Sequence, residues 1–286
     1  MMKKIGALVL ALSLTLSLTA CGQKAEQTAA QEEPESGEAE PVELVVFAAA
    51  SMTETLTEIA DLYQDAAPNV TLTFNFGSSG TLLTQIEEGA ECDLFISAAS
   101  TQMNALDGTL AQDAEKNPDG LDMLVPGSRI DLLENKVTLA VPEGNPKGIE
   151  SFDQLAQLLA DGSVFLAMGN SDVPVGQYTQ KIFAYYGLDE ASLAESGVLT
   201  YGSDVKEVTT QVSEAAVDCG VIYATDAFSA GLTVVDSATP EMCGQVIYPA
   251  AVIRGGNEEA AQAFLDYLQT DEAMAVFESV GFSPAF

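Results

Sequence analysis

Short turns made of small and hydroxyl-bearing residues recur along this chain. The first, Ala48-Ala49-Ala50-Ser51, follows the apolar residues 45–47 and precedes a stretch whose apolar residues have helical spacing. Similar turns lie at 78–79, 173–176 and 203–205. The first turn of a helix has unpaired N–H groups at the positive end of the helix dipole, so each turn could bind an anion.

One such turn is common in any α/β protein and needs no ligand. The recurrence is more informative, because ligands of open α/β sheets bind at the carboxyl ends of strands, where these turns lie. If two of the turns belong to one lobe and two to another, several helix N-termini surround one point. Such a site offers donors only, which suits a compact dianion.

Ser51 has a second possible role, because Glu54 follows it with the spacing of a capping box. In that arrangement the serine hydroxyl accepts a backbone N–H at the start of the helix. The two roles compete for the same hydroxyl. We therefore expect a ligand-free structure to show Ser51 capping its helix, and a bound one to show its hydroxyl turned toward an oxyanion.

The composition excludes several classes of function. Lys and Arg number 10 against 43 Asp and Glu, a net charge of −33, which argues against nucleic acid and anionic lipid as partners. Local N–H dipoles can still bind an anion in such a chain. The absence of histidine excludes Ser-His-Asp and Cys-His catalysis and removes the commonest metal ligand. We expect no enzyme, no cofactor and no direct metal site.

The elements that must position these turns alternate after Pro41, which predicts an α/β fold with mostly parallel sheets flanked by helices. Strands are expected at 70–76, 93–97, 136–142, 164–168, 198–201, 220–223 and 245–253, and 117–131 is rich in loop residues. Helices are expected at 81–88, 101–110, 152–159, 177–186, 204–217, 258–268 and 272–280, with caps at Ser151 and Asp204. Some 245 residues are enough for two lobes.

The N-terminus has the order of a bacterial lipoprotein signal. Residues 1–4 form a short basic segment through Lys3 and Lys4, and 5–20 are apolar or small. Leu18-Thr19-Ala20-Cys21 resembles the site at which such a cysteine becomes lipidated. We expect residues 1–20 to be a signal peptide and Cys21 to carry the lipid. Residues 21–41 are expected to form a disordered acidic tether. The protein would then lie outside the cytoplasm and contact the membrane through the lipid anchor alone.

Three further cysteines follow, Cys92, Cys219 and Cys243, and their spacing matches no metal site. A disulfide between Cys219 and Cys243 is possible in an exported protein. Buried free thiols are the favoured prediction.

Six motifs in order resemble the periplasmic molybdate-binding proteins of ABC transporters. They are Val46-Phe47-Ala48-Ala49-Ala50-Ser51, Gly77-Ser78-Ser79-Gly80-Thr81-Leu82, Asp93-Leu94-Phe95-Ile96-Ser97-Ala98, Val173-Pro174-Val175-Gly176-Gln177-Tyr178, Asp204-Val205-Lys206 and Gly220-Val221-Ile222-Tyr223-Ala224-Thr225-Asp226-Ala227. The resemblance implies a two-lobe type II periplasmic-binding-protein fold joined by two crossing strands. One lobe would comprise 42–127 and 247–286, and the other 128–246.

The resemblance also implies five ligand residues. Ser51 and Ser79 would offer hydroxyl and backbone N–H groups, Val175 and Val205 backbone N–H groups, and Tyr223 its phenolic O–H. Ser78 is an alternative to Ser79, and Val175 stands where the family usually has alanine. The nearby carboxylates of Asp172 and Asp204 are expected to face away from the anion, which they would repel.

The implied function is capture of molybdate or tungstate outside the membrane by a monomeric lipoprotein that delivers it to an ABC permease. The alternative is a protein of the same fold for another small oxyanion, such as sulfate or phosphate. A site for protonated phosphate needs a buried carboxylate acceptor, and the sequence shows no clear one.

Overall fold

The computed structural model describes residues 40–286, and these form one compact unit. The predictions of a signal peptide at 1–20 and of a lipid on Cys21 lie outside the described residues, as does nearly all of the tether at 21–41. No helix among the described residues is both long enough and apolar enough to cross a membrane.

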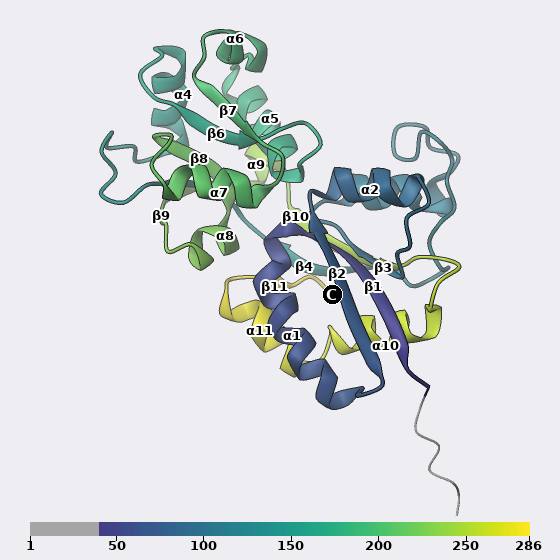
Figure 1. The fold of residues 1–286 in the computed structure, drawn as a ribbon. Helices are drawn as coiled ribbons and strands as arrows, with labels where there is room; N and C mark the ends of the chain where they lie inside the picture. Colours follow the sequence, from purple (N-terminus) through teal and green to yellow (C-terminus); the bar gives the residue numbers. More distant parts are fainter. Residues whose placement is uncertain (1–39) are drawn as a thin grey trace, which may run out of the picture. The chain divides into compact units, whose positions relative to one another are not determined.

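The first lobe is built on a six-stranded sheet with helices on both faces (Figure 1). Its strand order is β11 (Ser283–Pro284), β4 (Ile130–Asn135), β10 (Val246–Val252), β3 (Leu94–Ile96), β1 (Val42–Ala49) and β2 (Val70–Gly77). Its helical elements are η1 (Ala50–Met52), α1 (Thr53–Ala66), α2 (Ser79–Glu87), α3 (Ser100–Leu106), η2 (Gly108–Leu110), α10 (Glu258–Tyr267) and α11 (Asp271–Ser279).

Alternation along β1 serves both faces of this sheet. Leu44 and Val46 are buried with Leu56 of α1 and Phe264 of α10, whereas Phe47 belongs to a separate apolar cluster with α2 and α3. Because both faces are covered by helices, the carboxyl ends of β1 and β2 are the edge from which the turns at Ser51 and Ser79 emerge.

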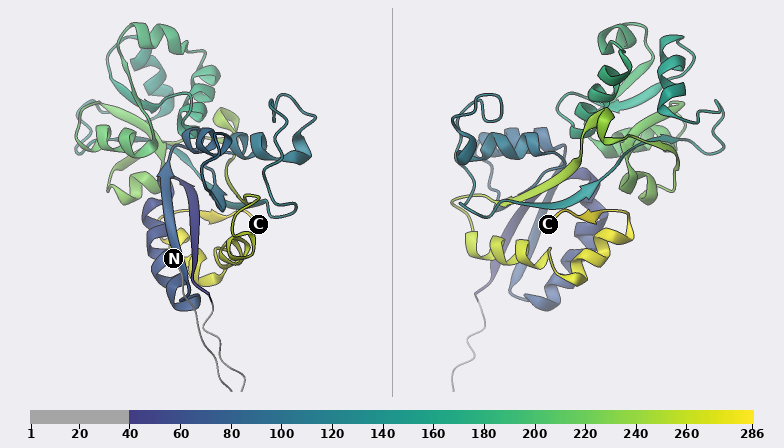
Figure 2. Two further views of the ribbon diagram at one scale, coloured as in Figure 1. Left: turned by 45° about the vertical axis from the view of Figure 1, so that its right-hand side comes forward. Right: turned by 180° about the vertical axis from the view of Figure 1, so that it is seen from behind.

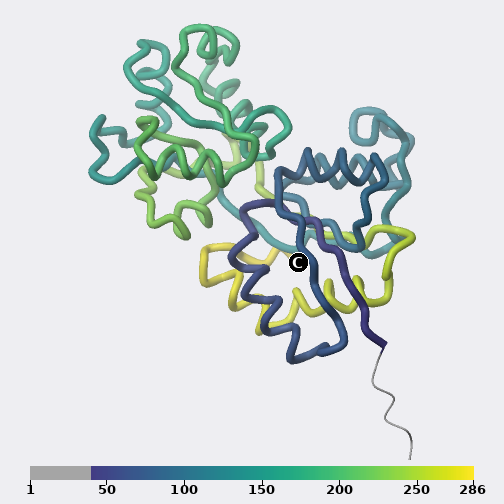
Figure 3. Tube along the Cα trace, viewed as in Figure 1, coloured from purple at the N-terminus to yellow at the C-terminus, as the bar shows by residue number. Residues whose placement is uncertain are grey.

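The second lobe is a five-stranded sheet in the order β7 (Leu199–Gly202), β6 (Leu166–Gly169), β8 (Cys219–Tyr223), β5 (Val137–Val141) and β9 (Thr233–Ser237). Its helices are α4 (Phe152–Ala160), α5 (Pro174–Tyr186), α6 (Glu190–Glu195), α7 (Val205–Ser213), α8 (Ala224–Ser229) and α9 (Pro240–Cys243). The trace in Figure 3 follows this lobe as one insertion between residues of the first.

Local chemistry explains where several helices begin. The Ser151 hydroxyl accepts the N–H of Gln154 at the start of α4, and the Asp204 carboxylate accepts the N–H of Glu207 at the start of α7. Both predicted caps are confirmed. Pro174 occupies the first turn of α5, where its missing N–H is no loss.

The first crossing lies later than expected, whereas the return lies at the expected boundary of 246 and 247. The chain leaves the first sheet after Asn135 and enters the second at Val137, not at 128, and it returns as β10 at Val246 (Figure 2). Strand β4 was not expected, because its Asp131 and Glu134 are residues that strands avoid. The sheets are also more mixed than expected, since β10 and β5 run antiparallel to their neighbours.

The three described cysteines carry free thiols, as predicted, and all three are buried. Burial raises the pKa of Cys92 to about 12, so its thiol is unreactive at neutral pH. In residues 40–286, no group of three or more His, Cys, Asp or Glu side chains is arranged to hold a metal ion.

Candidate functional site

The turns singled out in the sequence meet at a small cavity of about 200 Å³, a volume that includes open solvent. The first lobe lines it with Ala49, Ala50, Ser51, Gly77, Ser78 and Ser79, and the second with Val173, Pro174, Val205 and Tyr223. Four of the five expected ligand residues are therefore brought together. Val175 does not line the cavity; its side chain is fully buried in the core, and its N–H lies in the first turn of α5.

The two adjacent serines of the second turn have different roles. The Ser78 hydroxyl accepts the N–H of Thr81 and donates to the carbonyl of Asp172 in the other lobe, at 3.3 and 3.0 Å. The Ser79 hydroxyl accepts the N–H of Ala98 at 3.0 Å. Because Ser79 receives a hydrogen there, its own hydrogen remains to be directed elsewhere, which makes it the better candidate donor.

The predicted capping box at Ser51 is wrong. The chain first makes the 3-10 turn η1, so that α1 begins at Thr53 with Met52 at its N-cap and no described side chain capping it. The Ser51 hydroxyl lies 2.9 Å from the hydroxyl of Tyr248 instead. Glu54 is drawn away to Lys206. The prediction that a ligand-free chain uses Ser51 as a cap is wrong for the same reason.

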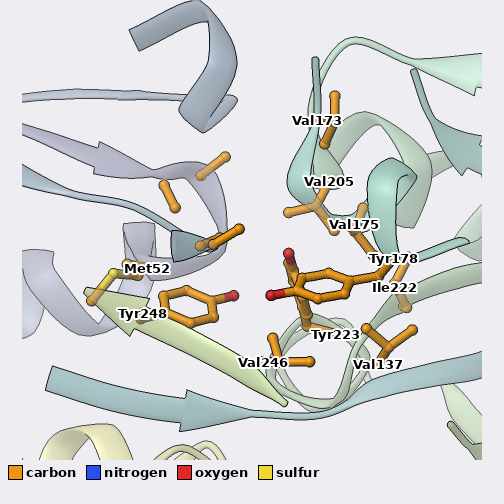
Figure 4. Close-up of a cluster of buried hydrophobic side chains, with 14 of the residues drawn as sticks. Met52, Val137, Val173, Val175, Tyr178, Val205, Ile222, Tyr223, Val246 and Tyr248 are labelled. Atoms are coloured by element: carbon orange, nitrogen blue, oxygen red, sulfur yellow. The ribbon is translucent and has the colours of Figure 1, made fainter. Parts of the chain in front are cut away.

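Three tyrosines approach the cavity from its two sides. Figure 4 shows the hydroxyl of Tyr178 directed toward that of Tyr248, whereas the hydroxyl of Tyr223 points toward Val205. The ring centroids of Tyr223 and Tyr248 are 5.7 Å apart, and those of Tyr178 and Tyr223 are 6.5 Å apart. The Tyr223 hydroxyl is buried and has no hydrogen-bond partner among residues 40–286. Burial raises the pKa of Tyr223 well above its usual value, so this hydroxyl stays protonated and can donate.

Sequence reasoning missed Tyr248. It lies within the apolar run of β10, where a tyrosine is an ordinary core residue. Only its partner, 197 residues away in sequence, marks it as part of the site. No motif or spacing could have identified it.

Backbone contacts join the two lobes beside the cavity. The carbonyl of Asp172 accepts the Gly80 N–H at 3.2 Å in addition to the Ser78 hydroxyl. A Cβ at position 80 would overlap that carbonyl, so only glycine allows this approach. The Asp172 side chain is exposed, and the Asp204 carboxylate is engaged as a cap. Neither aspartate lines the cavity.

A group of charged residues lies between the lobes. Lys206 of α7 bonds both carboxylate oxygens of Glu54 in α1, at 2.6 and 2.8 Å, and lies 3.2 Å from the carboxylate of Asp226 in α8. Burial lowers the pKa of Lys206, but Asp226 and Glu54 outweigh it and the net shift is upward. Lys206 is therefore a cation shared by two carboxylates from different lobes.

Asp226 is a buried carboxylate that sequence reasoning did not identify. Its side chain is fully enclosed, and apart from the Lys206 ammonium at 3.2 Å its oxygens have no polar partner within the described part of the chain. Burial raises the pKa of Asp226 to about 6, against the opposing attraction of Lys206. Asp226 does not line the cavity, so it leaves the lining free of carboxylates among the described residues.

Comparison with known proteins matches nearly all of the described chain. The family model for bacterial extracellular solute-binding protein matches residues 44–283. A putative ABC transporter substrate-binding lipoprotein, YvgL of Bacillus subtilis, is 32% identical over 290 residues, with 99% of each chain covered. The molybdate-binding protein ModA of Haemophilus influenzae is 30% identical over 242 residues, covering 84% of this chain and 89% of that one.

Solved structures show the same fold. The substrate binding domain of a putative molybdenum ABC transporter from Clostridium difficile has a TM-score of 0.61 at 30% identity, covering 86% of this chain and 100% of that one. The periplasmic molybdate-binding protein of Azotobacter vinelandii has a TM-score of 0.70 at 20% identity, covering 85% and 100%. Among the relatives found by sequence, a sulfate-binding protein of Synechococcus elongatus is 23% identical over 299 residues, covering 96% of this chain and 81% of that one. The two-lobe fold and the family resemblance are thereby confirmed.

Proposed function

The chain belongs to the bacterial extracellular solute-binding protein family, and from this premise we propose that it captures molybdate or tungstate between its lobes and delivers it to an ABC permease. Relatives at 30% identity or more include proteins named for molybdate binding and for ABC transport. The family is one of substrate-binding transport proteins and not a class of enzymes.

The observation that carries the proposal is the unpartnered, buried hydroxyl of Tyr223 at a cavity lined by Ser51 and Ser79. A buried polar group without a partner costs roughly 1–3 kcal/mol, so it is expected to have a partner in the functional state. The cavity lining offers hydroxyls and helix starts but no carboxylate among the described residues. A fully deprotonated tetrahedral dianion is the ligand that matches such a donor set.

The proposed ligand groups follow from this geometry. Ser51 and Ser79 donate from their hydroxyls and backbone N–H groups in the first lobe. Val175 and Val205 donate from backbone N–H groups in the first turns of α5 and α7, and Tyr223 donates its O–H. Each of these helix starts adds the positive end of a helix dipole.

Sulfate is the second candidate, because a sulfate-binding relative covers most of the chain. Molybdate and sulfate have the same charge and shape, so selection between them depends on size. The contacts of Gly80 and Ser78 with the Asp172 carbonyl fix how closely the lobes approach. We propose that these contacts thereby set the size of the anion that the cavity accepts, and we call them the size gauge.

A thermal-stability and calorimetric panel of molybdate, tungstate, sulfate and phosphate tests the proposal. A ligand that binds only the folded state raises its stability by mass action. Micromolar molybdate or tungstate is expected to raise the Tm of the purified protein, and equal sulfate is not. Equal stabilisation by sulfate would contradict selection by size. No response to any of the four anions would contradict the proposed function.

We further propose that residues 1–20 are removed on export and that Cys21 anchors the monomeric protein to the membrane through 21–41. The relative named a lipoprotein supports this proposal. Cys21→Ala is expected to release the protein from the membrane fraction into the soluble fraction. A variant that stays in the membrane fraction would contradict the anchor.

A further inference from the structure

A chain of buried hydrogen bonds runs from the crossing between the lobes to the candidate site. The amide of Asn135, the last residue of β4, donates to the hydroxyl of Thr225 at 3.0 Å and to that of Tyr248 at 3.2 Å. Tyr248 in turn lies 2.9 Å from the Ser51 hydroxyl. All four side chains are buried, so water does not offer alternative partners.

The direction of the hydrogens in this chain is fixed at its origin. The side-chain oxygen of Asn135 accepts the backbone N–H of Lys136 at 2.8 Å. An N–H can only donate, so the oxygen and nitrogen of the amide cannot exchange places without losing this bond. The nitrogen therefore faces Tyr248, and the Tyr248 oxygen must accept from it.

The same reasoning carries the direction on to Ser51. Tyr248 has a single hydrogen, and Asn135 cannot accept it, because its amide nitrogen donates to the Tyr248 oxygen. The Tyr223 hydroxyl contributes to the electrostatics of Tyr248 but makes no hydrogen bond of good geometry, so Ser51 is the described residue left to accept this hydrogen. Tyr248 therefore donates to the Ser51 oxygen. The hydrogen of Ser51 is then left to point into the cavity that Ser51 lines.

We propose that Asn135 and Tyr248 are positioning residues that fix Ser51 as a hydrogen-bond donor, and that this selects oxyanions whose oxygens carry no proton. The proposal rests on the proposed function of the cavity and adds what sets its preference. An anion with a hydroxyl group needs an acceptor in the site, and Ser51 held in this direction does not supply one. A freely rotating serine hydroxyl could act either as a donor or as an acceptor.

Sulfate and hydrogen phosphate form the sharpest pair of probes. At about pH 8 inorganic phosphate is mostly hydrogen phosphate, so both probes are tetrahedral dianions of similar size that differ by one proton. Their affinity ratio therefore reports on hydrogen-bond direction and cancels changes in charge and cavity size. Calorimetry with molybdate alongside gives the absolute affinity.

Tyr248→Phe is the variant that breaks the chain while keeping the ring. Molybdate affinity is expected to fall by about tenfold, the effect of one lost or misdirected hydrogen bond to a charged group. The preference for sulfate over hydrogen phosphate is expected to fall toward unity. The matched control is Tyr267→Phe in the same lobe, whose hydroxyl bonds only Glu272 at the surface and whose loss should change neither quantity.

Asn135→Asp is the second variant, in case the first does not fold. An aspartate accepts the Tyr248 hydrogen, so that Ser51 must donate to Tyr248 and presents its lone pairs to the anion. The added charge weakens all dianions alike, but the sulfate to hydrogen phosphate ratio should again fall. Rescue by Asn135→Gln is not expected, because the longer side chain displaces the amide.

The outcomes separate this proposal from the proposed function. A folded Tyr248→Phe or Asn135→Asp protein with the wild-type ratio overturns the positioning role, even if molybdate binds. A wild-type protein that binds hydrogen phosphate as tightly as sulfate also overturns it. If sulfate binds and molybdate does not, the proposed function fails while the ratio still tests the hydrogen-bond chain. Both fail together only if none of the anions binds.

Discussion

The two lobes contribute unlike halves to the cavity. On the first lobe, the hydroxyls of Ser51, Ser78 and Ser79 each have a protein partner at 3.3 Å or less. On the second lobe, Val173, Pro174 and Val205 offer helix starts without side-chain donors, and the Tyr223 hydroxyl has no partner among the described residues. The hydroxyls that the first lobe contributes are therefore preorganised, whereas the Tyr223 hydroxyl of the second lobe gains a partner only from a bound ligand.

This difference leads us to expect that an anion binds the first lobe before the second lobe closes on it. An anion that meets the first lobe finds donors already aimed, so it loses little freedom of the protein on binding. Closure of the second lobe then satisfies Tyr223 and excludes water. Removing a hydrogen-bonded hydroxyl of the first lobe should therefore lower both stability and binding, whereas removing the Tyr223 hydroxyl of the second lobe should lower binding alone.

The largest expected effect is that of Ser51→Asp. The variant places a like charge at a position where the native Ser51 is only 5% exposed, which costs roughly 3–5 kcal/mol or more. Molybdate affinity should fall by more than about a thousandfold, as measured by calorimetry. The Tm without ligand is the control for folding, and retained binding would mean that the anion lies elsewhere.

Gly80→Val tests the approach of the lobes. Its side chain would overlap the Asp172 carbonyl and hold the two lobes apart while leaving the donors of the first lobe in place. Molybdate affinity should fall by about a hundredfold, with selectivity over sulfate lost as well, because the gauge is removed. Thr84→Val, an exposed position on the same helix, is the matched control. Unchanged selectivity would refute the gauge.

Tyr223→Phe separates the two halves most directly. The hydroxyl has no protein partner among the described residues, so its removal should leave the free energy of unfolding without ligand unchanged or slightly raised. Molybdate affinity should fall by about tenfold. Tyr248→Phe removes two bonds within the first half and should lower the free energy of unfolding by about 1–2 kcal/mol. If the two variants lost equal stability in denaturant titrations, the difference between the two halves of the cavity would be contradicted.

The smallest effect concerns Asp226 and its pH dependence. Burial raises its pKa in the folded state to about 6 from 3.8, so its stabilising contribution is complete below the unfolded value and is lost as the pH rises through about 6. Asp226→Asn should therefore gain stability relative to the wild type between pH 4 and 7. Denaturant titrations of both proteins across this range measure the difference, which a flat profile would contradict.

Local chemistry made much of the fold predictable. The alternation of apolar runs with capped helices placed most strands and helices, and Ser151 and Asp204 mark helix starts that the structure confirms. Strand β4 escaped because acidic residues interrupt its apolar pattern. Its pairing with β10 stabilises it despite a composition that strands avoid.

The candidate site was predictable only where it lies on motifs. Ser51, Ser79, Val205 and Tyr223 line one cavity, but their ligand roles stay predictions. Tyr248 and the pairing of Glu54 with Lys206, 152 residues apart, depend on long-range packing that no local pattern encodes. Asp226 belongs to the motif that contains Tyr223, yet its burial and its cation partner come from the assembled lobes.

The ion pairs of Lys206 with Glu54 of one lobe and Asp226 of the other affect how long a bound anion would stay between the lobes. Its bond to Glu54 spans the two lobes, and the Glu54 and Lys206 side chains remain 51% and 30% exposed, so dissolved salt screens this pair far more than it screens the enclosed Asp226. Lys206 keeps its buried partner when the outer bond breaks. Under the proposed function, a higher ionic strength should therefore shorten the residence time of the bound anion, while the proposed donor groups remain unchanged.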